Sequence, residues 1–228
     1  MIDATSRLDV RNLQPAERDS KVLSAFESLE EGGALELTDD REPRHVLKQL
    51  EARHPGTVEW SSLEAGPVRY RTQIRRRPAS ASRTVSDYLG FDHRRLDGIL
   101  PDVAQRVANA DFAVARERFA EFTCGLDRHI EAEEQILFPD FERRTGMKSG
   151  PTVVMRAEHI EIRKWMAAAT AALDAQDPAG FRDALGQLRD VLEGHNLKEE
   201  QILYPMADEA AGDLRAQDDL VRQMQALL

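Results

Sequence analysis

The second half of the chain contains one eleven-residue motif twice, 66 residues apart. Residues 129–139 read HIEAEEQILFP and residues 195–205 read HNLKEEQILYP. His93 and His159 keep the same separation of 66 residues, and each lies 36 residues before the histidine that opens one copy of the motif. The repeat therefore predicts two copies of one helical hairpin, and each copy supplies one histidine followed by a His-x-x-x-Glu pair.

The spacing within the motif places its histidine and its glutamate on one face of a helix. Four residues advance a helix by about 400°, so each His-x-x-x-Glu pair lies on the same side, one turn apart. Apolar residues flank all four histidines at helical spacing. Two ionised glutamates in an apolar core are costly unless a cation pairs with them. Six residues are thus candidate metal ligands: His93, His129, Glu133, His159, His195 and Glu199.

The chemistry of these side chains narrows the choice of metal. Calcium and magnesium prefer oxygen ligands, and a single tetrahedral zinc needs only four ligands. Two metals that share both glutamates would each receive two imidazoles and two carboxylate oxygens. Iron favours five or six ligands, so this set leaves positions open for O₂, peroxide or nitric oxide, and zinc or manganese is less favoured. A duplicated hairpin with structural histidines and no metal remains the alternative.

The pattern after residue 83 predicts helices alone. Apolar residues recur there at spacings of three and four, and breaks fall near residues 109–111, 146–151 and 177–178. Four long helices with short connections are typical of an up-down-up-down four-helix bundle. Pro101 lies inside the first long segment and is expected to kink or split it. A shorter helix over residues 214–227 is expected to follow Gly212.

Residues 1–75 have a different pattern, in which strands alternate with helices. The expected strands are residues 8–10, 34–38, 58–60 and 68–74. Pro15 and Pro43 open the two helices, because proline fits the first turn of a helix. The order βαβαββ predicts a small two-layer α+β domain. Residues 76–83 lack apolar periodicity and are interpreted as a linker to the second domain, residues 84–228.

Composition limits the location and the partners of the chain. The 228 residues carry a formal net charge of −10, and residues 81–228 hold 18 Lys and Arg against 27 Asp and Glu. Nucleic-acid partners need clustered cations and are therefore disfavoured. No uncharged apolar run approaches about 18 residues, which excludes a membrane span, and the start of the chain has no apolar signal core. The single cysteine, Cys124, allows no internal disulfide, so the expected location is the cytoplasm.

At the histidines and glutamates of the repeat, the sequence resembles the hemerythrin family, also called the HHE cation-binding family. The resemblance covers about residues 84–210 and rests on the four histidines and the doubled His-x-x-x-Glu motif. It implies a non-haem di-iron cofactor, with two iron ions joined by a bridging oxygen species. Oxygen-carrying members have a second histidine on the third helix, where this chain has Arg163, and a last carboxylate at the position of Glu200. Whether Glu199 or Glu200 bridges the metals stays open.

The set of four histidines and two glutamates is similar to that of the bacterial iron-centre repair di-iron proteins. Those proteins are linked to the recovery of iron–sulfur clusters after nitric oxide or oxidative damage, and they carry paired N-terminal cysteines that this chain lacks. The N-terminal segment instead resembles an uncharacterised bacterial domain found ahead of hemerythrin-like domains, with a fold related to the TusA and SirA sulfur carriers. These carriers work through a cysteine. Residues 1–123 contain none, so sulfur transfer by this domain is excluded.

These observations predict a di-iron protein that binds or reacts with O₂, peroxide or nitric oxide, in iron handling, cluster repair or the response to oxidative or nitrosative stress. Two alternatives stay open: a non-catalytic sensor that relays to a protein partner through the N-terminal domain, and a structural zinc-binding bundle. Asp97, one turn after His93, is a candidate extra ligand or an acceptor for an imidazole N–H. Gly125 is a candidate for either a small ligand pocket or close helix packing.

Overall fold

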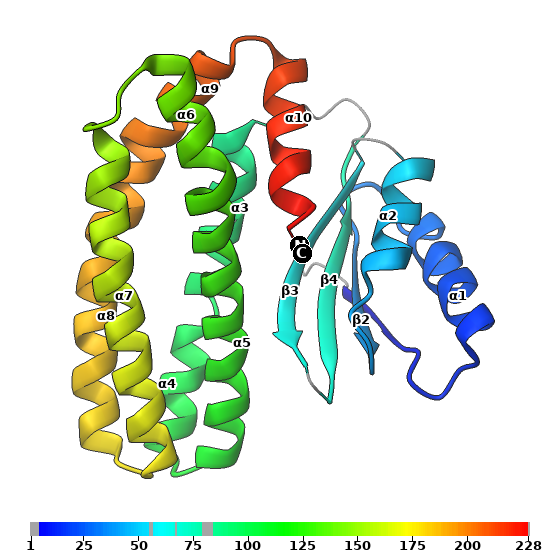
Figure 1. The fold of residues 1–228 in the computed structure, drawn as a ribbon. Helices are drawn as coiled ribbons and strands as arrows, with labels where there is room; N and C mark the ends of the chain where they lie inside the picture. The colour runs from blue at the N-terminus through cyan, green and yellow to red at the C-terminus, as the bar shows by residue number, and fades with distance from the viewer. Residues whose placement is uncertain (1–4, 55–56, 67, 79–83, 228) are drawn as a thin grey trace. The chain divides into compact units, whose positions relative to one another are not determined.

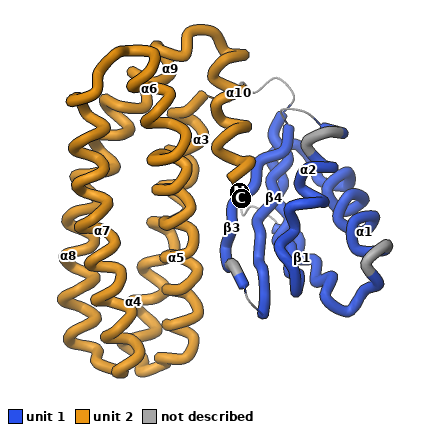
Figure 2. Tube along the Cα trace, viewed as in Figure 1, with its two compact units in different colours: residues 1–83, 228 blue, residues 84–227 orange. Residues whose placement is uncertain are grey.

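The computed structural model describes residues 5–54, 57–66, 68–78 and 84–227. Contacts between residues divide the chain into two compact units, residues 1–83 and residues 84–227 (Figure 2). Among the described residues, no helix is both long and apolar enough to cross a membrane.

The N-terminal unit is a four-stranded sheet with two helices (Figure 1). Its elements are β1 (Thr5–Asp9), α1 (Pro15–Glu27), β2 (Ala34–Asp39), α2 (Arg44–Arg53), β3 (Val58–Ala65) and β4 (Tyr70–Arg76). The strand order is β1-β2-β4-β3, with β1 parallel to β2 and the other pairs antiparallel. Phe26 of α1 and Leu50 of α2 share one apolar core with Leu35 and Ile74 of the sheet. The predicted α+β class and βαβαββ order are confirmed.

All four strands of this unit differ in extent from the prediction: β1 covers Thr5–Asp9 rather than residues 8–10, and β2 ends one residue later, at Asp39. β3 continues past Trp60 to Ala65, and its pairing with β4 shifts register between Ser62 and Glu64. Such a shift breaks the alternation of buried and exposed side chains, which hides the end of the strand in the sequence pattern. β4 begins at Tyr70, and Val68 before it is 80% exposed.

The C-terminal unit is all-helical, as predicted (Figure 1). Its segments are α3 (Val85–Asp97), α4 (Leu100–Ala108), α5 (Phe112–Ala132), η1 (Glu133–Leu137), α6 (Phe138–Thr145), α7 (Pro151–Asp174), α8 (Pro178–Lys198), η2 (Glu199–Leu203), α9 (Tyr204–Ala211) and α10 (Leu214–Gln225). The segments α5, η1 and α6 are continuous, as are α8, η2 and α9. Together with α7 and the α3–α4 pair they make the four long helices of the bundle. The break between α3 and α4 lies just before Pro101, where a split was expected.

Both copies of the motif contain one turn of π-helix, which the sequence analysis did not predict. These turns cover Glu133–Leu137 and Glu199–Leu203. Pro139 and Pro205 each follow two residues after the end of a π-turn. Proline has no N–H, and its ring crowds the carbonyl four residues earlier, so a wider turn relieves the conflict inside a continuous helix. Such π-turns are frequent at functional sites.

The predicted metal ligands lie in a polar layer between two apolar clusters of the bundle. On α3, Leu89 belongs to one cluster and Leu96 to the other, and His93 lies between them. On α7, Met155 and Ile162 flank the next histidine of the repeat in the same way. Apolar packing on both sides buries the inner polar atoms of this layer, so these atoms must find partners within it.

Gly125 of α5 packs closely against α3. A Cβ atom at this position would lie 2.7 Å from Leu96 Cδ2 and 2.8 Å from Arg95 Nη2. The glycine therefore permits close helix packing, and the alternative expectation of a small ligand pocket at Gly125 is wrong.

We expect Gly125→Ala to destabilise the fold, although alanine is the better helix former by about 1 kcal/mol. The buried Leu96 side chain would have to move, and overpacking of this kind costs about 1–3 kcal/mol. Gly186 of α8 is the matched control, since nothing lies within 4 Å of a Cβ added there. Gly186→Ala should stabilise the chain. Urea unfolding of both variants measures the two effects, and equal shifts of the same sign would contradict close packing at Gly125.

Candidate metal centre

The six predicted ligands converge from four helices of the bundle. His93 comes from α3, His129 and Glu133 from α5 and the start of η1, His159 from α7, and His195 and Glu199 from α8 and the start of η2. All six are at most 4% exposed. Their side-chain donor atoms form two groups, each within 4.8 Å. Glu133, His159, His195 and Glu199 form one group, which we call the His159 half-site. His93, His129 and Glu199 form the other, the His93 half-site.

The two glutamates lie between the two pairs of imidazoles. Glu199 Oε1 is 3.1 Å from His195 Nε2, and its Oε2 is 3.3 Å from His93 Nε2. Glu133 Oε2 is 3.3 Å from His159 Nε2 and 3.7 Å from His129 Nε2. Each carboxylate thus lies close to one imidazole of the His93 half-site and one of the His159 half-site, which is the placement that a bridging ligand requires.

Each of the four histidines also contacts a second carboxylate through its other ring nitrogen. His93 Nδ1 lies 2.8 Å from Glu200 Oε1, and His159 Nδ1 lies 2.8 Å from Glu134 Oε1. The corresponding acceptors of His129 and His195 are Asp92 and Glu158, both at 3.1 Å. A carboxylate accepts the Nδ1–H and so turns Nε2 inward, as is usual for metal-binding imidazoles.

The sequence analysis did not predict the outer role of these four carboxylates, although the repeat contains them, and it considered Glu200 only as a possible bridging ligand. Asp92 and Glu158 directly precede His93 and His159, and Glu134 and Glu200 are the second glutamates of the two motif copies. Asp97, the acceptor that was considered, does not take this role, because Glu200 occupies the Nδ1 side of His93. The structure also gives the two neighbouring glutamates of the second motif different environments. Glu199 is fully buried between the imidazoles, whereas the Glu200 side chain is 43% exposed.

Burial and the neighbouring charges shift the pKa values of the inner residues. Burial raises the pKa of Glu133, and the charge of Glu199 raises it further, to about 8. Burial also acts to raise the pKa of Glu199, but its close contacts with the His195 and His93 imidazoles outweigh burial and hold the pKa well below its usual value. Burial lowers the pKa of His93, but Glu199 and Glu200 outweigh this effect and raise it to about 9. Without a cation, these shifts therefore favour a proton on Glu133 and an ionised Glu199.

Three buried atoms of the cluster make no hydrogen bond: Glu133 Oε2, His159 Nε2 and Glu199 Oε1. An unpaired buried polar atom costs about 1–3 kcal/mol, and more if it is charged. All three atoms belong to the His159 half-site. Imidazole nitrogens and carboxylate oxygens that face one another in this way fit a bound transition-metal cation, which would satisfy all three.

Comparison with known proteins agrees with this geometry. A family model described as the hemerythrin HHE cation binding domain matches residues 84–207. The chain belongs to the hemerythrin HHE family. Family membership and the buried cluster of histidines and glutamates together indicate that the C-terminal unit binds metal. The model of an uncharacterized conserved protein, DUF2249, matches residues 7–76, so the expected domain ahead of the hemerythrin bundle is present. Its relation to the sulfur carriers stays a prediction.

One relative of this hemerythrin-family chain is a protein named DNA nickase from Nostoc sp. strain PCC 7120. The two are 25% identical over 122 residues, which is 53% of this chain and 32% of the relative. The chain thus spans about a third of the length of that protein. No solved structure matches the chain significantly.

Tyr204 is a further residue of the hemerythrin centre that the sequence analysis did not select. Its side chain is fully buried, and its hydroxyl donates toward Glu133 Oε1 at 2.7 Å and Glu199 Oε2 at 2.9 Å. Burial and the two carboxylate charges raise its pKa well above the usual value, so it keeps its proton. The sequence feature that could have identified this residue is the motif position before proline, which is Phe138 in the first copy and Tyr204 in the second.

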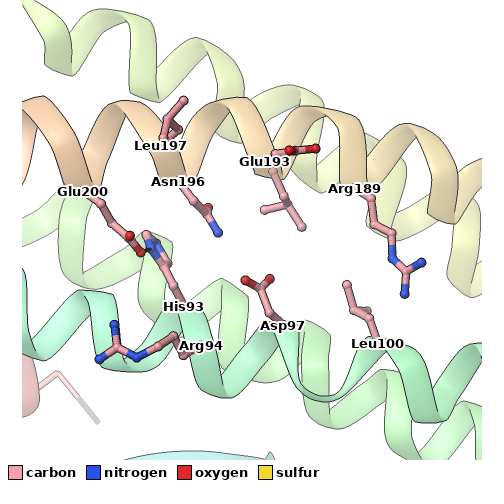
Figure 3. A pocket seen from close by; sticks show the side chains of 10 residues that line it. His93, Arg94, Asp97, Leu100, Arg189, Glu193, Asn196, Leu197 and Glu200 are labelled. Atoms are coloured by element: carbon pink, nitrogen blue, oxygen red, sulfur yellow. Dashed lines mark hydrogen bonds and ion pairs between the residues drawn. The ribbon is translucent and has the colours of Figure 1, made fainter.

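A cavity of about 470 Å³ lies beside His93, between α3, the start of α4 and α8 (Figure 3). His93 and Glu200 form one part of its wall, and the Asp97 side chain points into it. Arg163, 66 residues after Asp97, holds the equivalent place in the repeat. There the Arg163 guanidinium lies 3.3 Å from the outer carboxylate of Glu134. The His93 side of the centre therefore borders a cavity, whereas the His159 side has the Arg163 guanidinium beside its outer carboxylate.

Proposed function

We propose that the C-terminal unit is a non-haem di-iron centre that binds or reacts with O₂, peroxide or nitric oxide. His93 and His129 would hold one ion, His159 and His195 the other, and Glu133 and Glu199 would lie between the two. One observation carries the proposal: both carboxylates reach both pairs of imidazoles, while three of the inward-facing atoms lack a hydrogen-bond partner.

The donor set supports iron over the other metals considered. Four imidazoles and two carboxylates are more than one tetrahedral zinc can use, and the nitrogen donors disfavour calcium and magnesium. When bound, a pair of iron ions supplies one-electron redox chemistry and coordination positions left open for a small ligand.

The residues of the chain prepare this site in three ways. The outer carboxylates fix each imidazole with Nε2 facing inward. The apolar clusters on both sides bury the inner polar atoms, which strengthens electrostatic interactions within the layer. The Tyr204 hydroxyl holds a proton next to the two inner carboxylates.

A rapid-mixing experiment tests the proposed reactivity. The full chain is loaded with ferrous iron without oxygen and mixed in turn with O₂, hydrogen peroxide and nitric oxide while absorbance is recorded. At least one of the three should produce an iron-dependent change, and the chain loaded with zinc should give none. No change in absorbance with any of the three oxidants or ligands would contradict the proposal. Consumption of more oxidant than the iron present, with a reductant supplied, would indicate an enzyme, and a single stoichiometric reaction would favour the sensor alternative.

The outer carboxylates provide a separate prediction about metal affinity. Glu134→Ala and Glu200→Ala should each weaken iron binding about 10–100-fold, because the imidazole loses the acceptor that orients it. Glu131→Ala is the matched control, since Glu131 is exposed on the same helix as His129. Competition with a chelator of known affinity measures the change. Unaltered affinity in both outer variants would mean that these contacts do not support metal binding.

A further inference from the structure

The two halves of the centre differ at the last aromatic residue of the motif. Phe138 stacks on His159, with ring centroids 5.8 Å apart and an interplanar angle of 11°. Tyr204, its counterpart in the second copy, packs beside His93 with ring centroids 5.7 Å apart. The Phe138 ring carries no polar atom, so the repeat brings a hydroxyl to only one of the half-sites.

The Tyr204 hydroxyl lies where the donor atoms of the His93 half-site converge. Besides its bonds to Glu133 and Glu199, it is 3.3 Å from His93 Nε2 and 3.3 Å from His129 Nε2. These are the inward-facing nitrogens of that half-site, and Nε2 of His93 is only 3.1 Å from Nε2 of His129. A cation that binds both nitrogens and Glu199 has to use the space that the hydroxyl now fills.

The His159 half-site has no such obstacle. Its atoms Glu133 Oε2, His159 Nε2 and Glu199 Oε1 are buried and without hydrogen bonds, so a cation there would replace only the ion-pair contacts of Glu199 Oε1 with His195 Nε2 and of Glu133 Oε2 with His159 Nε2. In the His93 half-site, a cation must displace the Tyr204 hydroxyl, whose single O–H is shared between Glu133 Oε1 and Glu199 Oε2. A hydrogen bond to an ionised carboxylate such as Glu199 is stronger than a neutral one. The His93 half-site also groups three donor residues, against four in the His159 half-site.

We propose that Tyr204 sets the order in which the centre fills: the His159 half-site binds its ion first, and the His93 half-site binds only after the Tyr204 hydroxyl is displaced. This inference rests on the proposed two-metal site. The cavity beside His93 (Figure 3) gives the second ion a route to solvent. On the opposite side, the Arg163 guanidinium lies against the outer carboxylate of Glu134. The tyrosine is thus a positioning residue that makes the second ion weakly held and exchangeable.

Titration of the metal-free full chain with ferrous iron, without oxygen and followed by calorimetry, tests this order. The unchanged protein should bind two ions in two steps, with the second at least tenfold weaker. Tyr204→Phe keeps the ring and should tighten the second step at least tenfold while the first stays the same. His93→Ala should lose the weak step and keep the tight one. Phe138→Tyr, which adds a hydroxyl to the other half-site, should weaken the first step.

The possible failures separate the two proposals. If the unchanged chain and Tyr204→Phe both bind two ions and the second step is equal or weaker in the variant, the role of Tyr204 is overturned and the two-metal site stands. If His93→Ala loses the tight step, the order of filling is overturned. If the unchanged chain and Tyr204→Phe both bind one ion or none, the two-metal site itself fails. Circular dichroism of each variant confirms that the helices are retained.

Discussion

Glu133→Ala and Glu199→Ala are each expected to leave less than one iron ion per chain, against two in the unchanged protein. The reason is geometric, because each carboxylate reaches an imidazole of both half-sites. Loss of either one removes a ligand that both ions would share. Metal analysis of the purified variants after anaerobic loading with ferrous iron measures the effect.

Two control variants make this result specific. Glu131→Ala, on the exposed side of the same helix, should keep two ions. Glu200→Ala should bind iron more weakly but still bind two ions at saturation, because Glu200 contacts only the outer nitrogen of His93 in the centre. Two ions in Glu199→Ala together with fewer in Glu200→Ala would reverse the roles assigned to these neighbours.

The second large effect concerns the stability of the chain without metal. We expect the free energy of unfolding of the metal-free protein to fall as the pH rises from about 6.5 to 8. Folding raises the pKa of Glu133 from 4.5 to about 8 and that of His93 from 6.5 to about 9. A group whose pKa is raised by folding stabilises the fold while it is protonated, and this stabilisation is lost as the pH rises through the folded-state pKa.

The size and the window of this effect follow from the same shifts. One pKa unit corresponds to about 1.4 kcal/mol, so the loss is on the order of several kcal/mol for groups buried this deeply. Glu199 has the opposite shift, and its contribution is lost only below its unfolded pKa near 4.5, outside this window. Bound metal replaces the protons, and an ion that binds only the folded state adds stability by mass action.

Glu133→Gln provides the test of this pH dependence. The amide has nearly the same shape and no charge at any pH, so the metal-free variant should be more stable than the unchanged chain at pH 8 and should lose less stability between pH 6.5 and 8. Thermal unfolding of both proteins in the presence of a chelator measures the difference. If the variant and the unchanged chain lose the same stability between pH 6.5 and 8, Glu133 does not titrate in this range.

The sequence predicted the bundle and the six inner residues because a linear signal encodes both. The 66-residue repeat sets the register of His93, His129, His159 and His195, and helical periodicity places each motif glutamate on the same face as its histidine. Pro101 likewise marked the split of the first long helix, since proline cannot continue a regular helix.

The remaining features depend on contacts between helices, which periodicity does not report. Glu200 reaches His93 across the bundle, over a separation of 107 residues, and Tyr204 reaches Glu133 over 71 residues. The π-turns depend on how Pro139 and Pro205 are accommodated within continuous helices. Asp97 had the right spacing on its own helix, but Glu200 on the neighbouring chain segment occupies the place that Asp97 would need.

The measurement that tests the central claim most directly is iron content per chain, taken together with the absorption spectrum. The full chain is made metal-free, loaded with ferrous iron without oxygen, freed of unbound metal and then exposed to air. We predict two iron ions per chain and new near-ultraviolet absorption after exposure. No retained iron, or one tightly held zinc ion in its place, would contradict a di-iron centre and would leave the repeated histidines and glutamates a different role in the bundle.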